Sequence, residues 1–361
     1  MDNIKTDIRS VLALMVFMSF QALSASDNTE ALTPLYSYHD DNQQVGVGAQ
    51  QPEKPPVNHS LLPFLGDDAR ARGYDLPEPF GVNINYMNIR QNIDVDSINF
   101  NGLSLDGGNI QCKTRTCQRA FNKIFGNGPV PLGNAFKIDV GKTRENSKTE
   151  TLKLDAWLLP FMNVYGLVGH TEGHSISQIG VGVDLPKAGT VHPKNLQNLD
   201  FRLDFKGTTY GVGMTLVGGI GNGFALMDGN YTQTRFDILD GSINAFTFSP
   251  RVGYRFTTPA VDTIHLPSGK LNVWVGSMYQ DVQQEFKGSL SDLTMPSQAL
   301  QSMVNLANQH DNGRFDVKQH LQSPWNVLLG AQYEITRYFN VTTEIGFAER
   351  NSFFVAGEYR F

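Results

Sequence analysis

The residues best suited to chemistry are two histidines and a serine. His170 and His174 are separated by three residues, a spacing that holds zinc when both side chains share one face of a helix. The glycines and alternating polarity around them favour a strand instead, where side chains four positions apart are about 13 Å from each other. Ser175 follows His174 directly, and adjacent strand residues point to opposite faces, which makes a poor nucleophile–base pair. We therefore expect His170 and His174 to lie in a loop or at a rim, and we expect neither a metal site nor enzymatic activity.

A glycine-rich segment, 218–223 (GGIGNG), is no better as a phosphate site. We expect no helix after it, so the segment is typical of a hairpin turn. We expect no cofactor elsewhere in the chain. The formal net charge of −6 argues against nucleic acid as a partner.

Charged residues inside alternating segments are more informative. Two interpretations stay open: mutually satisfied ion pairs that fill the interior of a closed sheet, or a polar pore whose local field selects solutes. We expect the charges at 137, 139, 153 and 155 on neighbouring strands. The candidate lumen-lining residues are Lys137, Asp139, Lys153, Asp155, Arg251, Arg255, Glu334, Glu344, Glu358 and Arg360.

The elements that would position these charges are strands, because period-2 alternation dominates from residue 81 onward. In Ser352–Phe361, Phe353 and Val355 alternate with polar or small residues. Phe246–Phe256 repeats the pattern and places Arg251 on the polar face. Such strands belong either to a soluble sandwich, whose apolar face points into a core, or to a transmembrane barrel, whose apolar face meets lipid.

Aromatic residues at strand ends, such as Trp325 and Tyr254, favour the membrane barrel because they fit an interfacial girdle. Segments of about ten residues fit a tilted bilayer crossing. A last strand ending at Phe361 fits barrel closure, since open sheet edges cannot exist in lipid. We therefore predict an all-β fold: a transmembrane, antiparallel, up-and-down β-barrel.

We predict about 12 strands, with ten as the alternative because the second strand is the weakest. Both ends of the barrel and the short connections are expected on the periplasmic side, and the longer segments 178–203 and 286–322 outside. The short connections are 159–162, 219–223 and 336–339. The expected strands are 81–91, 93–103, 135–146, 149–160, 163–177, 204–219, 223–238, 243–257, 270–285, 323–335, 339–349 and 352–361.

The segment 286–322 contains one helical pattern, with Ser297 as N-cap and Leu300, Val304 and Ala307 at helical spacing. This helix either constricts the barrel mouth or covers its rim. Elsewhere, Cys112 and Cys117 could close a small disulfide loop in an oxidising compartment. A count of 12 strands places that loop on the periplasmic side.

The N-terminus indicates the compartment. Residues 1–25 have the basic flank, the apolar stretch from Val11 to Phe20 and the small residues of a secretory signal. Residues 26–79 are expected to form an irregular periplasmic extension, whose apolar part packs against the barrel or plugs it. The barrel is expected to occupy residues 80–361.

Seven blocks of the sequence carry a resemblance to known proteins: LPFLGDDARARGYDLPEPFGVNINY (62–86), KLDAWLLPFMNVYGLVG (153–169), FKGTTYGVGMTL (205–216), SPRVGYRF (249–256), VWVGSMYQDV (273–282), SPWNVLLGAQY (323–333) and EIGFAERNSFFVAGEYRF (344–361). Together they resemble an uncharacterised family of Gram-negative outer-membrane β-barrel proteins. The resemblance covers about 62–361 and implies a barrel in the bacterial outer membrane, with its lipids and the barrel-assembly machinery as partners; it carries no catalytic residues. The C-terminal strand resembles the barrel-assembly signal, with Tyr359 and Phe361 at its hydrophobic positions and Ala356 as a departure.

The leading hypothesis for function is a narrow passive channel for small hydrophilic solutes. The alternative is a closed barrel with a structural or surface-interaction role of the adhesion or virulence type, acting through the segments 178–203 and 286–322. A third hypothesis, an outer-membrane hydrolase, lacks a convincing set of residues.

Overall fold

The computed structural model describes residues 61–361 with short gaps. These gaps are 106–113, 117–118, 121–122, 124–129, 133–135, 186–188, 238, 261–267 and 309. The expected signal sequence at 1–25 and the expected disulfide partners Cys112 and Cys117 lie outside the described residues.

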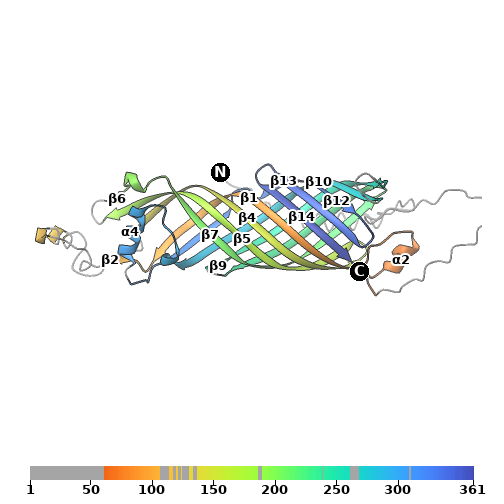
Figure 1. The fold of residues 1–361 in the computed structure, drawn as a ribbon, viewed down its shortest axis with the longest axis horizontal. Helices are drawn as coiled ribbons and strands as arrows, with labels where there is room; N and C mark the ends of the chain where they lie inside the picture. Colours follow the sequence, from red (N-terminus) through yellow and green to blue (C-terminus); the bar gives the residue numbers. More distant parts are fainter. Residues whose placement is uncertain are drawn as a thin grey trace, which may run out of the picture.

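One antiparallel sheet of 12 strands closes on itself to form a barrel (Figure 1). Its first strand pairs with its last from Gly81 with Arg360 to Arg90 with Asn351. At the closure, Phe80 and Phe361 exchange two backbone hydrogen bonds of 3.1 and 2.9 Å. Ten strands form the ring: β1 (Phe80–Asn101), β4 (Phe136–Leu159), β5 (Met162–Leu185), β7 (Leu199–Ile220), β8 (Gly223–Phe236), β9 (Asp240–Thr258), β10 (Gly269–Ser289), β12 (Trp325–Glu334), β13 (Phe339–Phe347) and β14 (Asn351–Arg360).

The other two strands of the sheet lie toward one end of the barrel. There β11 (Arg314–Leu321) pairs with β1 on one side and β10 on the other, and takes the place of β12, β13 and β14 in the wall. The short β6 (Gly189–Val191) pairs with the end of β5. We call this the far end, and the end where Phe80 meets Phe361 the terminal end.

The predicted fold class is confirmed, but two predicted hairpins are wrong. The segments 81–91 and 93–103 form one continuous strand, β1, and 135–146 and 149–160 form one continuous strand, β4. Neither junction contains the glycine or proline that a tight turn would use. The sheet therefore has 12 strands while its ring has ten, the number that was the alternative.

The remaining elements are small and lie near the barrel ends (Figure 1). They are α2 (Gly66–Ala71), β2 (Ser104–Leu105), β3 (Val130–Pro131), η1 (Lys194–Leu196), η3 (Leu290–Asp292) and α4 (Gln298–Ala307). No helix among the described residues is long and apolar enough to cross a membrane.

The connections alternate between the two ends largely as predicted. The short connections at 159–162, 219–223 and 336–339 lie at the terminal end, and 178–203 and 286–322 belong to the far end (Figure 1). The merging of two strand pairs changes one placement. Because β1 runs uninterrupted to the far end, the connection from β1 to β4 leaves the barrel there, so its expected placement with the chain termini is wrong.

The two faces of the strands exchange polarity partway along the barrel. On β7, outward residues are charged or polar in 202–206 and mainly apolar in 210–216. Inward residues change in the opposite sense: Phe205 lies in an apolar core, whereas Thr209 lines a polar cavity. Both halves keep the same period of two, so the strand is continuous while its buried face changes character.

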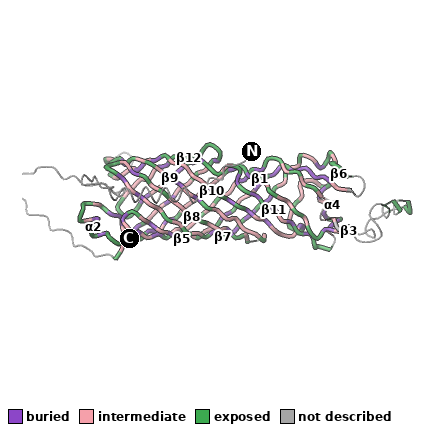
Figure 2. The backbone as a smooth tube through the Cα atoms, turned by 180° about the vertical axis from the view of Figure 1, so that it is seen from behind, coloured by how far each residue is buried: buried purple, intermediate pink, exposed green. Residues whose placement is uncertain are grey.

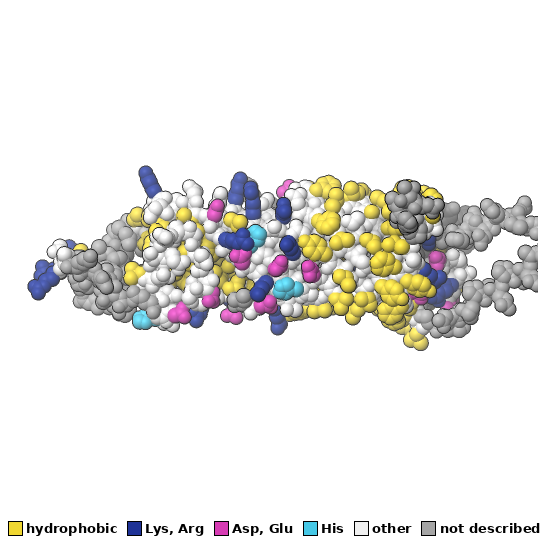
Figure 3. Space-filling model, in the orientation of Figure 1, with side chains coloured by type: hydrophobic (Ala, Val, Ile, Leu, Met, Phe, Trp, Pro, Cys, Tyr) yellow, Lys and Arg dark blue, Asp and Glu magenta, His cyan; other side chains and the backbone are white. Residues whose placement is uncertain are grey.

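The outer wall near the terminal end carries a band of exposed apolar side chains, which we call the apolar belt (Figure 3). Ile84 is 72% exposed and Val212 65%. Exposed aromatic residues stand at both of its edges, as in a membrane barrel. At the terminal edge these include Phe80, Tyr254, Phe256, Tyr338, Tyr359 and Phe361, and at the other edge Tyr210, Tyr231, Phe246, Trp325 and Phe347.

Beyond the belt the interior of the barrel is apolar. Phe286 and Val181 are fully buried there, and the rings of Phe236 and Phe286 stack with centroids 4.9 Å apart. We call this cluster the outer core; Figure 2 marks buried residues at this end of the barrel. Its buried members are Leu103, Ile179, Val181, Leu196, Leu203, Phe205, Phe286, Leu290, Leu300, Val304, Ala307, Phe315 and Val317.

The predicted helix in 286–322 is α4, which begins where the sequence indicates. The Ser297 hydroxyl accepts a hydrogen bond of 3.2 Å from the Leu300 amide, the contact of an N-cap. Leu300, Val304 and Ala307 are its buried residues and belong to the outer core. The helix therefore helps to fill the far end rather than lying over it as a separate element.

Candidate functional site

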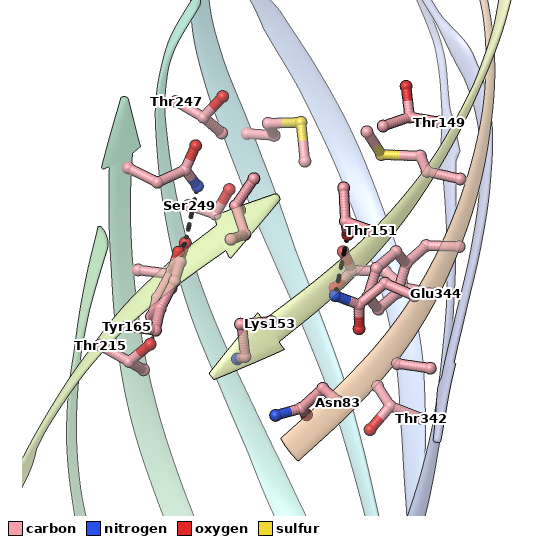
Figure 4. Close-up of a pocket in the computed structure, with 18 of the residues that line it drawn as sticks. Asn83, Thr149, Thr151, Lys153, Tyr165, Thr215, Thr247, Ser249, Thr342 and Glu344 are labelled. Atoms are coloured by element: carbon pink, nitrogen blue, oxygen red, sulfur yellow. Dashed lines mark hydrogen bonds between the residues drawn. The ribbon is translucent and has the colours of Figure 1, made fainter. Parts of the chain in front are cut away.

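The strands of the belt enclose a polar cavity of about 440 Å³. Figure 4 shows hydroxyl, amide and charged side chains converging on it from several strands: Lys153 from β4, Tyr165 from β5, Ser249 from β9 and Glu344 from β13. Their convergence follows from alternation, because every second residue of each strand points inward. This cavity is the candidate functional site.

A buried charge cluster lines the lumen at the terminal end. Arg360 donates to Asp155 at 2.9 Å, with side chains only 5% and 2% exposed, and also contacts Glu358. Asn83 and Asn163 donate to the same Asp155 carboxylate at 2.8 and 2.6 Å. Every oxygen of this carboxylate therefore has partners, which is the condition under which a buried charge is tolerated.

A second cluster lies on the opposite wall at the same end. Arg255 donates to Asn272 at 3.0 Å and lies 3.8 Å from Glu334. Asn272 in turn donates to Glu334 at 2.9 Å and to Gln332 at 3.1 Å. Both clusters line the terminal end of the cavity.

Deeper in the belt, two carboxylates are held by different kinds of donor. Arg251 makes a two-bond contact with Glu344 at 2.7 and 2.9 Å, and the Trp274 indole donates to Glu344 at 2.7 Å. Asp228, by contrast, accepts from neutral groups, including the Tyr165 hydroxyl at 2.9 Å and Thr215 at 2.7 Å. Lys153 lies over the Tyr165 ring, with its ammonium 4.5 Å from the ring centre.

The cavity meets the outer core at Glu145. This carboxylate is 4% exposed and accepts from Gln284 at 2.7 Å and Gln91 at 3.2 Å. Glu145 lies seven residues beyond Leu152, the last exposed apolar residue of the belt on β4. Burial raises the pKa of the Glu145 carboxyl, and the amides of Gln284 and Gln91 only partly offset this.

Residues before the first strand lie across the mouth at the terminal end. Trp157 on β4 donates its amide to the Pro79 carbonyl at 2.9 Å, and Arg360 donates its Nε to the Glu78 carbonyl at 3.0 Å. The Glu78 carboxylate lies 3.1 Å from Arg337, in the connection between β12 and β13. Leu76, in the same segment, is 2% exposed. The segment 76–79 thus contacts three parts of the ring: β4, β14 and the connection between β12 and β13.

Eight of the ten charged residues proposed from the sequence surround this cavity. They are Lys153, Asp155, Arg251, Arg255, Glu334, Glu344, Glu358 and Arg360. The expectation for the other two is wrong: Lys137 and Asp139 lie on the outer surface, 57% and 68% exposed, near Asp184 and His192. Both precede a β-bulge between Val140 and Thr143 on β4, which shifts the alternation by one position and turns these residues outward. They also share strand β4 with Lys153 and Asp155 rather than lying on a neighbouring strand.

Three residues of the site were not singled out from the sequence: Glu145, Tyr165 and Asp228. Each stands at an inward position of its strand, and Asp228 is a charged residue in the alternating segment of β8, a signal that could have found it. The histidines behave as the strand geometry requires. His170 is exposed on the outer face of β5, and Ser175 is 3% exposed on the inner face.

No family model matches the sequence, and no curated protein is significantly similar to it. Among solved structures, the transport unit of the autotransporter AIDA-I from Escherichia coli is similar over 78% of this chain and 90% of its own, at 10% identity and a TM-score of 0.28. The Ralstonia pickettii toluene transporter TbuX covers 79% of this chain and 90% of its own, at 9% identity and a TM-score of 0.26. A Pseudomonas aeruginosa FadL homologue covers 80% and 91%, at 10% identity and a TM-score of 0.26.

These are distant structural similarities to β-barrels of Gram-negative bacteria, and they assign no family to this chain. The function of the barrel is therefore inferred from the residues of its own wall and lumen.

Proposed function

We propose that this protein is an outer-membrane barrel with a closed lumen, which acts through the part of the barrel that projects beyond the apolar belt. The observation that carries the proposal is the outer core. Phe286 and Val181 are 0% exposed and Leu290 is 1% exposed, across the interior where a channel would run. Water has no polar partners there, since apolar cores exclude it.

The membrane location is supported by the belt and its aromatic edges. Strand length supports the projection. β4 and β5 have 24 residues each, whereas a tilted strand crosses the hydrocarbon layer with about 9–11 residues. More than half of each strand therefore lies outside the lipid, with charged side chains facing water. This projecting half has the polarity of a soluble β-domain and suits a structural or surface-interaction role.

A second candidate, a narrow passive channel for small hydrophilic solutes, is supported by the polar cavity of about 440 Å³. Such a channel would require the outer core to open. The two candidates differ in a property that can be measured directly.

Liposome swelling distinguishes them. Purified protein is reconstituted at known density, its insertion is checked by heat-modifiable migration, and the vesicles are diluted into small sugars and amino acids. We expect no swelling beyond that of empty vesicles, while a general porin in parallel vesicles gives size-dependent swelling. Size-dependent swelling with this protein would overturn the closed lumen and favour the channel.

A further inference from the structure

A row of basic side chains stands just beyond the belt on one side of the barrel. On four strands, the outward residue four positions beyond a residue at the belt edge is Lys or Arg, and all four cations are exposed. We call them the cationic arc. The belt residues and their cations are Tyr86 and Arg90 on β1, Leu152 and Lys148 on β4, Tyr210 and Lys206 on β7, and Tyr231 and Arg235 on β8.

Their common spacing sets a common height. Four residues extend about 13 Å along a strand, which a tilt of about 45° converts to about 9 Å along the membrane normal. The polar headgroup layer begins at the edge of the hydrocarbon and is roughly 5–8 Å thick on each side. The long Lys and Arg side chains therefore reach the layer where lipid headgroups carry their phosphates.

The arc is confined to part of the circumference. β1, β4, β5, β7 and β8 are consecutive in the ring. On the other side the same four-residue step leads to neutral residues, from Phe246 to Ser242 on β9 and from Tyr279 to Gln283 on β10. Two acids face outward within the arc: Glu172 on β5 stands in register between Lys148 and Lys206, and Glu150 on β4 lies between Lys148 and Leu152.

The arc cations also differ from other surface cations in their partners. Beyond the belt on the opposite side, Lys287 and Lys318 lie 2.8 and 3.4 Å from Glu285. Within the described part of the chain, no carboxylate lies within 4.0 Å of an arc cation, and Arg235 lies 5.7 Å above the Tyr210 ring. Their charges are therefore available to an anion from outside the protein.

We propose that the cationic arc binds phosphate groups of the surrounding lipid. Phosphate oxygens form short, charge-assisted hydrogen bonds with Lys and Arg, and each such cation at a membrane surface contributes about 1 kcal/mol, which corresponds to about a fivefold change in affinity. This inference rests on the proposed membrane location. It gives the barrel a preferred lipid-facing side, centred on β4, β5 and β7.

The test is a binding titration of the full chain in uncharged detergent with diphosphorylated lipid A, followed by native mass spectrometry. The arc variant combines Arg90→Gln, Lys148→Gln, Lys206→Gln and Arg235→Gln, and we expect it to bind at least a hundredfold more weakly. The matched control combines Lys287→Gln and Lys318→Gln, and its affinity should stay within about twofold of the unaltered protein. Unaltered affinity of the arc variant would overturn the proposal.

A variant that is expected to tighten lipid A binding distinguishes an electrostatic effect from a folding defect. Glu172→Gln removes the acid between two arc lysines and should tighten lipid A binding by up to about fivefold; unchanged affinity would contradict an electrostatic arc. Failure of this inference is distinguishable from failure of the proposed function. A protein that inserts into phosphatidylcholine vesicles but does not bind lipid A refutes the arc alone, whereas a protein that does not insert refutes the membrane location.

Discussion

Arg360, at the end of the last strand, contacts Asp155 on β4 across the intervening first strand, with 2.9 Å between guanidinium and carboxylate. The two residues are 205 positions apart in the sequence and meet only when the barrel closes. The strand between them carries Gly81, where an added Cβ would lie 2.3 Å from the Asp155 carboxylate and 2.9 Å from Arg360. The charge pair therefore links β14 to β4 across β1, at the closure of the barrel, which we call the seam. It occupies the space that a side chain at position 81 would need.

Removing Arg360 should destabilise the barrel strongly. Arg360→Gln removes the cation that contacts the buried Asp155 and the partly buried Glu358, and we expect the free energy of unfolding to fall by about 3–5 kcal/mol. Guanidinium unfolding in vesicles, followed by tryptophan fluorescence, measures this loss. Arg337→Gln, which breaks an exposed pair with Glu78, is the control and should cost under about 1 kcal/mol. Equal effects of the two variants would contradict a buried seam.

Gly81→Ala tests the close approach at the seam. We expect it to lower the free energy of unfolding by about 1–3 kcal/mol, because the new methyl group displaces the charge pair. Gly357→Ala on β14 is a matched control, since nothing lies within 4 Å of the position of its Cβ. The same guanidinium unfolding measures both, and a neutral Gly81→Ala would show that the pair is not confined as described.

The exchange of polarity along β7 allows a test of where the belt ends. Val212 and Asp204 face outward on the same strand, one within the belt and one beyond it. Val212→Arg should cost about 2–4 kcal/mol of folding free energy in vesicles, the depth-dependent penalty of a lipid-facing cation. Asp204→Arg should cost less than about 1 kcal/mol, since the side chain stays in water. Comparable costs would place the belt elsewhere.

Glu145 predicts an unusual dependence of stability on pH. Burial raises the pKa of this carboxyl above the ordinary 4.5, and the group lies beyond the belt. Below pH 4.5 both folded and unfolded states hold the proton, so the group affects stability little. As pH rises above 4.5, the unfolded chain ionises first, so the free energy of unfolding falls until the folded carboxyl ionises too.

Comparison of the unaltered protein with Glu145→Gln isolates this effect. The difference between their free energies of unfolding should favour the variant increasingly as pH rises above 4.5 and should then level off. Equilibrium unfolding at several pH values provides the measurement. A difference that stays constant across this range would show that Glu145 ionises alike in both states.

Much of the barrel wall could be predicted from the sequence because each strand has one face toward the lumen and one toward the outside, which gives a period of two. The alternation in Phe246–Phe256 predicts a strand with Arg251 and Arg255 inward, and both line the cavity. The helix after Ser297 is equally local, since its cap and its apolar spacing are adjacent in the chain.

The exchange of polarity was missed because alternation does not tell which face is inside. On β4 a further cause is a β-bulge between Val140 and Thr143, which adds one residue, so that Lys137 and Asp139 face outward although an unbroken alternation would align them with Lys153 and Asp155. The outer core and the placement of β11 depend on contacts between distant segments, as when Phe205 and Phe286 meet with ring centres 5.6 Å apart. No local pattern encodes such a meeting.

The closed lumen is the central claim, and single-channel recording in planar bilayers tests it most directly. Refolded protein with verified heat-modifiable migration is added to the bilayer over a range of salt concentrations, pH values and voltages, with a general porin as the positive control. We expect insertion without stepwise conductance, because the outer core occupies the interior around Phe286. Reproducible unit steps that scale with salt concentration would contradict the closed lumen.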